Sequence, residues 1–157
     1  MTRRILENLT RQAQALRVLL LLQEEEFAHL KEFRPQSVGA LEFSIQELMR
    51  QILVERTNVR TMMAAINPAA RRLRELSEVF GEAWPALAKV LDEIDALEQT
   101  TAKQAEKSYR LALALFDQSS GYMEFFRKEL TPKRLTYGPR GVIGQAKPDP
   151  ALMRGAF

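Results

Sequence analysis

Hydrophobic side chains recur at intervals of three and four residues through most of the chain, which is the spacing that lines up one face of an α-helix. The first such segment predicts a helix over about residues 3–33, because Arg34-Pro35 then disfavours helical backbone. The positions on its stripe are Ile5, Leu9, Gln12, Leu16, Leu19, Gln23, Phe27 and Leu30.

The second segment has the most regular pattern and predicts a helix over residues 37–66. A 3.5-residue period held over this length is typical of a coiled-coil seam, which needs a neighbouring helix along its whole length. Only Glu55 is out of character among the positions that carry the period. These positions are Val38, Leu41, Ile45, Leu48, Ile52, Glu55, Val59, Met62 and Ile66.

Two more helices are expected after residue 66. Asn67-Pro68 ends the second helix and can start another, with asparagine as N-cap and proline at the first helical position. A short helix over 69–80, ended by Gly81, would follow, and a long final helix over about 85–130. Within the final helix, Glu98–Lys107 is polar nearly all round, which is typical of a spacer that crosses solvent. Whether this spacer is helix or hinge stays open.

These elements predict an all-α fold, a long antiparallel helical hairpin or three-helix coiled-coil-like bundle over residues 1–130 with an extended C-terminal helix. Residues 131–157 hold four of the seven prolines and four of the seven glycines, with little periodicity. Such a segment buries too little apolar surface to offset the entropy of ordering it, so we expect a flexible, basic tail. Its five basic residues against Asp149 give +4, which leaves about −1 for the rest of the chain, because the total is +3.

Composition narrows the class of protein. The chain of 157 residues is 46% hydrophobic and 27% charged, as expected of one soluble domain, and it has no cysteine for a disulfide or a thiolate site. The leucine run Leu19–Leu22, ended by Glu24–Glu26, is too short for a secretory signal or a membrane span. We therefore expect a cytoplasmic protein.

Candidate chemistry is sparse. Glu26 and His29 form the Glu-x-x-His pattern of helical di-iron proteins, but that site needs a second histidine and His29 is the only one. The triplet Glu24–Glu26 fits a charged helix face better than a catalytic carboxylate pair. Gly138, Gly141 and Gly144 lack the flanking strand and helix of a nucleotide loop. The sequence therefore predicts no enzyme, no cofactor and no metal.

A binding surface is suggested near the end of the final helix. Apolar residues from Leu111 to Leu130 spread over an arc near 180°, whereas a helix seated on one neighbour needs little more than 100°. This arc packs against two helices of its own bundle, or its spare width takes a helix of a partner. The candidate partner-binding residues are Leu111, Leu115, Phe116, Tyr122, Phe125, Phe126 and Leu130, with Tyr137 in the tail.

The order of these elements resembles the FlgN family of flagellar type III export chaperones. The resemblance is carried by the leucine run followed by acids at Leu19–Leu30, by the heptads of Val38–Arg56 that close on Arg56, and by the TYGPRG segment at Thr136–Gly141. It implies a cytoplasmic chaperone that binds the hook–filament junction proteins through its C-terminal helix. It also implies docking at the export gate and its ATPase through the tail that carries Tyr137.

Two other functions compete with this interpretation. The unbroken seam of residues 38–66 would also suit a generic coiled-coil adaptor or assembly module, and it leaves a homodimer open. The basic tail would suit nucleic-acid binding, but its charges are thinly spread and Tyr137 is its only ring apart from the terminal Phe157. We therefore expect no nucleic acid among the partners.

Overall fold

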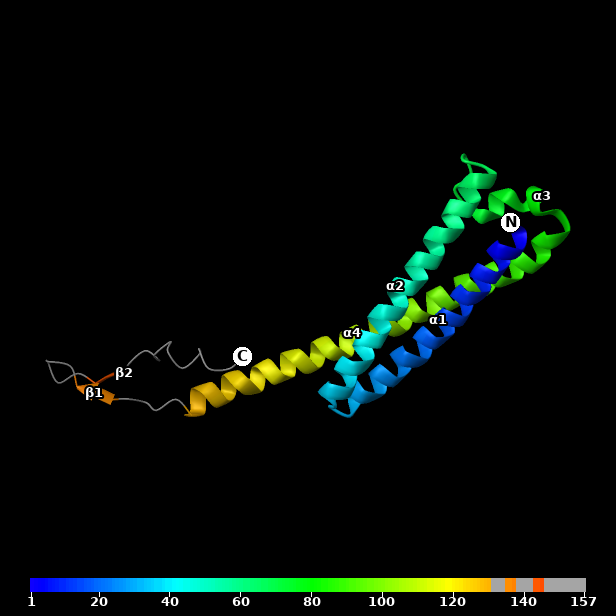
Figure 1. Cartoon of the computed structure of the whole chain (residues 1–157). Helices are drawn as coiled ribbons and strands as arrows, with labels where there is room; N and C mark the ends of the chain where they lie inside the picture. The colour runs from blue at the N-terminus through cyan, green and yellow to red at the C-terminus, as the bar shows by residue number, and fades with distance from the viewer. Residues whose placement is uncertain (131–134, 138–142, 146–157) are drawn as a thin grey trace. The chain divides into compact units, whose positions relative to one another are not determined.

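A computed structural model describes residues 1–130, 135–137 and 143–145, and it divides the chain into two compact units, Met1–Leu113 and Ala114–Phe157. The first unit holds α1 (Thr2–Lys31), α2 (Pro35–Ile66), the short helix α3 (Ser77–Phe80) and the first part of α4 (Trp84–Leu130) (Figure 1). The second unit holds the rest of α4 and two short strands. The predicted all-α fold is confirmed.

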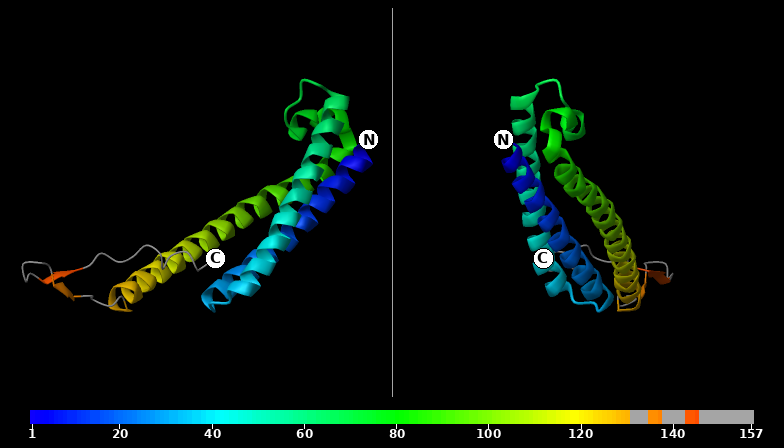
Figure 2. Two further views of the ribbon diagram at one scale, coloured as in Figure 1. Left: turned by 60° about the vertical axis from the view of Figure 1, so that its left-hand side comes forward. Right: turned by 90° about the vertical axis from the view of Figure 1, so that its right-hand side faces the viewer.

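Helices α1 and α2 form an antiparallel hairpin whose backbones approach closely (Figures 1 and 2). The connection contains Phe33 with a left-handed φ of 55°, and Pro35 occupies the start of α2, where its missing N–H costs no hydrogen bond. The buried stripe of α1 contains most of the positions that the spacing predicted, the polar ones included. The buried residues of α1 are Ile5, Asn8, Leu9, Gln12, Ala13, Leu16, Leu19 and Gln23.

The heptad seam of α2 packs inside the chain. Its buried members are Ile45, Ile52 and Val59, joined by Met63, and the same apolar core contains Ile5, Leu9 and Leu16 of α1. The neighbouring helix that a seam of this length requires is therefore α1.

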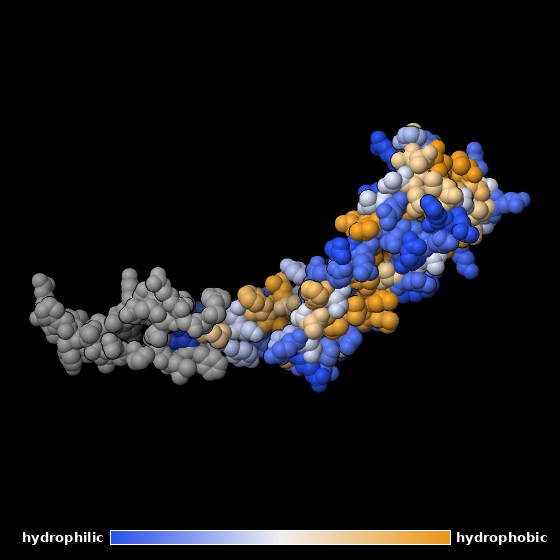
Figure 3. All heavy atoms as spheres, in the orientation of Figure 1, coloured by the Kyte–Doolittle hydropathy of each residue, from blue (hydrophilic) through white to orange (hydrophobic). Residues whose placement is uncertain are grey.

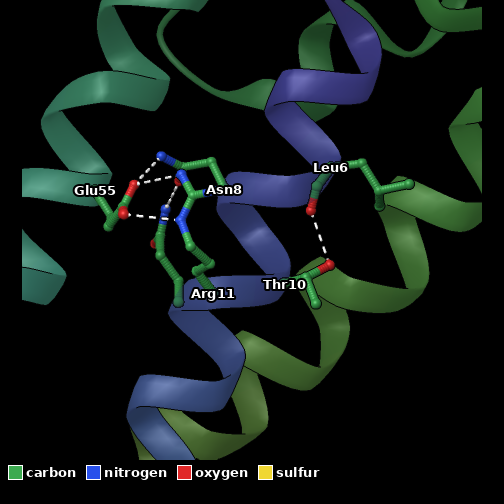
Figure 4. A network of polar contacts seen from close by, with 6 residues as sticks. Leu6, Asn8, Thr10, Arg11 and Glu55 are labelled. Atoms are coloured by element: carbon green, nitrogen blue, oxygen red, sulfur yellow. Dashed lines mark hydrogen bonds and ion pairs between the residues drawn. The ribbon is translucent and has the colours of Figure 1, made fainter.

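Glu55, the one acidic residue of the α2 seam, lies in a polar network with α1 (Figure 4). Its carboxylate accepts hydrogen bonds from Arg11 Nε and Nη2 at 2.9 and 3.1 Å, and a further one from Asn8 Nδ2. Asn8 is buried, and its Oδ1 accepts a hydrogen bond from Gln12 Nε2 at 2.6 Å. Hydrogen bonding to Arg11 lowers the pKa of Glu55. The polar interruption of the seam is thus a linked set of partners that fixes the alignment of α1 against α2.

The segment after α2 departs from the predicted helix over 69–80. Asn67 accepts a hydrogen bond from Ala69 N–H at its Oδ1, at 3.0 Å, and one from Ala70 N–H at its backbone oxygen, at 3.1 Å, which closes a turn that is not continued as a helix. A 3₁₀ turn over Leu73–Leu76 and the single α-turn α3 then follow, with a second 3₁₀ turn over Gly81–Ala83. Short helical turns thus replace the single predicted helix. The residues that this segment buries in the core are Leu73, Leu76 and Phe80, which still follow helical spacing.

The first part of α4 packs on the hairpin in the same direction as α1. Leu87 and Ile94 enter the core, and the ion pairs Arg17–Glu93 and Arg56–Glu98 join α4 to α1 and α2. Arg74 bridges Asp92 and Asp95 of α4 at 2.8 Å each. An apolar stripe flanked by ion pairs therefore seats this part of α4.

Two strands lie within the range for which the sequence predicted a flexible tail. Strand β1 (Leu135–Tyr137) pairs antiparallel with β2 (Ile143–Gln145), and Thr136 faces Gly144 in the register. Local spacing did not predict this pairing, which depends on a contact between two three-residue segments. The rest of the predicted tail, 131–134, 138–142 and 146–157, lies outside the described residues.

Near the turn between α1 and α2, a half-buried carboxyl is held away from its ordinary ionisation. Burial raises the pKa of Glu26 to about 7, and hydrogen bonding to the Glu42 carboxyl and its charge add to this. A raised pKa in the folded state means that the folded protein binds this proton more tightly than the unfolded chain. The stability contributed by Glu26 is thus full below pH 4 and is lost as the pH rises through about 7.

We expect Glu26→Gln to raise the free energy of unfolding at pH 8 by about 1 kcal/mol, a value reduced from the full shift because the group is partly solvated. At pH 4 the substitution should change little, because the carboxyl is then protonated in both states. Urea unfolding at the two pH values measures the difference. The exposed neighbour provides the control: a similar pH-dependent gain in Glu24→Gln would contradict this assignment.

Candidate partner-binding face of α4

The core-facing stripe of α4 continues past the apolar core as a layer of polar residues. From Ile94 the positions Leu97, Thr101, Gln104 and Ser108 follow at alternating steps of three and four, and Thr101 and Ser108 are buried. The polar character of this segment was predicted, but the expectation that it crosses solvent is wrong for this side of the helix. Residues 98–107 are continuous helix rather than hinge.

Two residues of this part of α4 contact α1. Gln104 Nε2 lies 3.5 Å from the backbone oxygen of Gln23, and Lys107 Nζ lies 4.5 Å from the centre of the Phe27 ring. Thr101 Oγ1 donates within the helix to the Glu98 oxygen at 3.1 Å. Of the seam positions, Gln104 thus meets a carbonyl of α1, and Lys107 beside it meets an aromatic face. Ser108 Oγ is buried without a hydrogen-bond partner among the described residues.

Beyond the polar layer, the sequence-predicted residues differ in exposure. Phe116, Tyr122 and Phe125 are exposed by 68%, 57% and 58%, whereas Leu111 and Leu115 are half-buried. The side chains of the other three predicted residues lie outside the described part of the chain; these are Phe126, Leu130 and Tyr137.

Two stripes can be distinguished at about 100° per residue along α4. Leu111, Leu115 and Tyr122 continue the stripe that is buried earlier in the helix, and Gln118 Nε2 donates to the Tyr122 hydroxyl at 3.4 Å. The second stripe contains Phe116 together with three further exposed residues that the sequence analysis did not select. They are Tyr109, Leu113 and Met123.

The second stripe could have been found from its spacing. Tyr109, Leu113, Phe116 and Met123 are separated by four, three and seven residues, which keeps them on one side of a helix. Together the two stripes leave α4 with apolar side chains on more than half of its circumference over residues 109–125. An arc of this width can contact a second helix even where one side is already half-buried.

The structure offers little for other chemistry in its described part. His29 Nε2 lies 3.7 Å from Glu25 Oε1, and no group of three or more metal-ligating side chains gathers among the described residues. Of the helices that the structure describes, none combines the length and the apolar content needed to cross a bilayer.

Comparison with known proteins gives one match. The family model described as FlgN protein matches residues 1–143, which is most of the chain. No curated protein and no solved structure matches it. The matched range contains the helical hairpin, the whole of α4 and the segment with β1. The chain therefore belongs to the FlgN family, a family of flagellar export chaperones.

Proposed function

We propose that this chain is a cytoplasmic chaperone that binds the hook–filament junction proteins of the bacterial flagellum and delivers them to the type III export gate. The observation that carries the proposal is the apolar face of α4, where Phe116, Tyr122 and Phe125 are exposed. Membership of a family of export chaperones supports the same function. Rings of this kind bury large areas at a low cost in side-chain entropy, so a few can supply most of an interface.

The chemistry of the cargo suits such a face. A structural protein that assembles only after export must present terminal segments that are unfolded beforehand and apolar enough to associate prematurely. An amphipathic helix of the cargo laid against α4 would cover those residues and keep them soluble. The complex must also dissociate at the gate, so a face made of separate exposed rings, with moderate affinity, fits the task better than a deep pocket.

The generic adaptor has less support. This hypothesis was based on the long heptad seam of α2. Three residues of that seam, Ile45, Ile52 and Val59, are buried in the chain's own core. Leu48, Met62 and Ile66 also pack against this core, so most of the seam is occupied within the chain.

We expect the double substitution Phe116→Ser with Tyr122→Ser to weaken binding to a purified junction protein by at least about tenfold, because two interface rings are removed. Isothermal titration calorimetry measures the affinity, and far-UV circular dichroism checks that helix content is kept. Val79→Ser is the matched control, because Val79 is an exposed apolar residue on α3. Unchanged affinity in the double variant would exclude α4 as the cargo site.

Delivery to the gate is tested separately at the tail. Tyr137→Ala should leave junction-protein affinity unchanged while lowering secretion of that protein into the medium, since Tyr137 is proposed to contact export-gate or ATPase components. Thr136→Ala, on the same strand, is the control. Equal secretion by the wild type and Tyr137→Ala would remove the proposed role of this residue.

A further inference from the structure

The side of α2 that faces away from the core carries two exposed hydrophobic side chains. Phe43 is 77% exposed, the largest value for any large hydrophobic side chain in the described part of the chain, and Val54 is also exposed. At about 100° per residue, Phe43, Glu47, Arg50 and Val54 fall within about 60° of one another. The buried residues Ile45, Ile52, Val59 and Met63 lie on the opposite side of the helix. Figure 3 shows hydrophobic residues reaching the surface between charged ones along the helices.

These four residues, named here the α2 stripe, have a symmetric order. Along the helix they read apolar, acidic, basic, apolar at steps of four, three and four. Glu47 is half-buried and Arg50 is exposed, and Arg50 Nε and Nη2 donate to the Glu47 carboxylate at 3.0 and 2.7 Å. Hydrogen bonding between them lowers the pKa of Glu47, so this charge is present at neutral pH.

The order determines which alignment of two such stripes is favourable. In an antiparallel pair, Phe43 of one copy meets Val54 of the second copy, and Glu47 meets Arg50 of the second copy. In a parallel pair, Glu47 would meet Glu47 and Arg50 would meet Arg50, which is repulsive. An antiparallel pair is also two-fold symmetric, so the same patch supplies both sides of the contact.

We propose that the α2 stripe is a self-association surface that pairs with the stripe of a second copy of this chain in antiparallel alignment. The Glu47–Arg50 pairs of the two copies then form a four-charge network at the centre, which selects the register. This proposal stands apart from the export role, because it uses no residue of α4.

The proposed interface is small, so its affinity is expected to be low. The stripe covers three turns of helix, about 16 Å in length. Stable interfaces bury about 800 Å² on each partner, so a contact of this length makes a weak dimer that forms at high protein concentration.

Complementary charge reversals test the proposal on the full chain. Sedimentation velocity should show wild-type dimers at ~100 µM that dissociate on dilution to ~1 µM, as expected of a small interface. Glu47→Arg places two arginines against two arginines, and Arg50→Glu places two glutamates against two glutamates. Each variant alone should associate at least about tenfold more weakly than the wild type.

Mixing the two variants gives the decisive result. In the mixed pair each arginine of one chain meets a glutamate of the other, so a heterodimer should form at wild-type strength. Glu7→Arg is the control, since Glu7 is exposed on α1 and its carboxylate pairs with Arg3 at 3.3 Å. Restored association also proves that both variants are folded.

Three outcomes would overturn the proposal. They are a wild type that stays monomeric at ~100 µM, where an interface of this size should associate, reversals that leave association unchanged, and a mixture that fails to restore it. A monomeric wild type whose reversals weaken the binding of a junction protein would assign the stripe to the cargo instead.

Discussion

Replacing Leu87 with alanine is expected to lower the free energy of unfolding by about 3 kcal/mol, within the range found for large-to-small substitutions in protein cores. Leu87 is fully buried, with 0% exposure, and it is where α4 first enters the core of the Met1–Leu113 unit. Removal of its side chain leaves a cavity between α4 and the hairpin that the surrounding helices fill only in part. Urea unfolding followed by far-UV circular dichroism measures the loss.

The same substitution at Leu113 is the matched control. Leu113 lies on the same helix but is 47% exposed, so Leu113→Ala should change the free energy of unfolding by less than about 0.5 kcal/mol. Equal losses at the two positions would mean that α4 is not seated on the hairpin through Leu87.

The second large effect is expected at Glu55. Glu55→Ala should lower the free energy of unfolding by about 2 kcal/mol, because Asn8, which is 1% exposed, loses the acceptor for its Nδ2 group. Arg11 loses its carboxylate partner at the same time. The double variant Asn8→Leu with Glu55→Leu should recover only part of this loss. It removes the unsatisfied Asn8 donor, but buried Gln12 then loses the acceptor of its Nε2 group.

The pKa of Glu55 gives an independent check. Hydrogen bonding to Arg11 lowers this pKa in the folded state, so the unfolded chain binds the proton more tightly. The stability due to Glu55 is therefore present above the ordinary pKa of a glutamate and is lost as the pH falls through the lower, folded value. The destabilisation by Glu55→Ala should shrink below about pH 4, the ordinary range of a glutamate carboxyl. A loss that stays constant with pH would contradict the role given to the charge.

Much of the fold was predictable because helical spacing is a property of the chain itself. The stripes of α1 and α2, and the core positions Leu87 and Ile94, follow from steps of three and four residues. The candidate face of α4 was also predicted from residue spacing, and Phe116, Tyr122 and Phe125 are exposed on it. Which protein covers that face stays a prediction, because exposure shows that a surface is open and does not identify its occupant.

The burial and the partners of polar residues within the same stripes could be known only from the tertiary structure. By sequence, Glu55 interrupted a seam, and residues 98–107 read as a solvent-crossing spacer. In the fold, Glu55 is bound by Asn8 and Arg11, while Thr101 and Ser108 are buried beside α1. The pairing of β1 with β2 likewise depends on two segments meeting.

The sequence alone therefore determined the three long helices, their apolar faces and the family resemblance. The tertiary structure decided which polar side chains are buried and where the short helices before α4 begin. The physical reason is that the period of a helix depends on its own backbone and side-chain order. Burial of a polar group instead depends on its surroundings in the fold, as where Glu55 of α2 supplies the acceptor for Asn8 of α1.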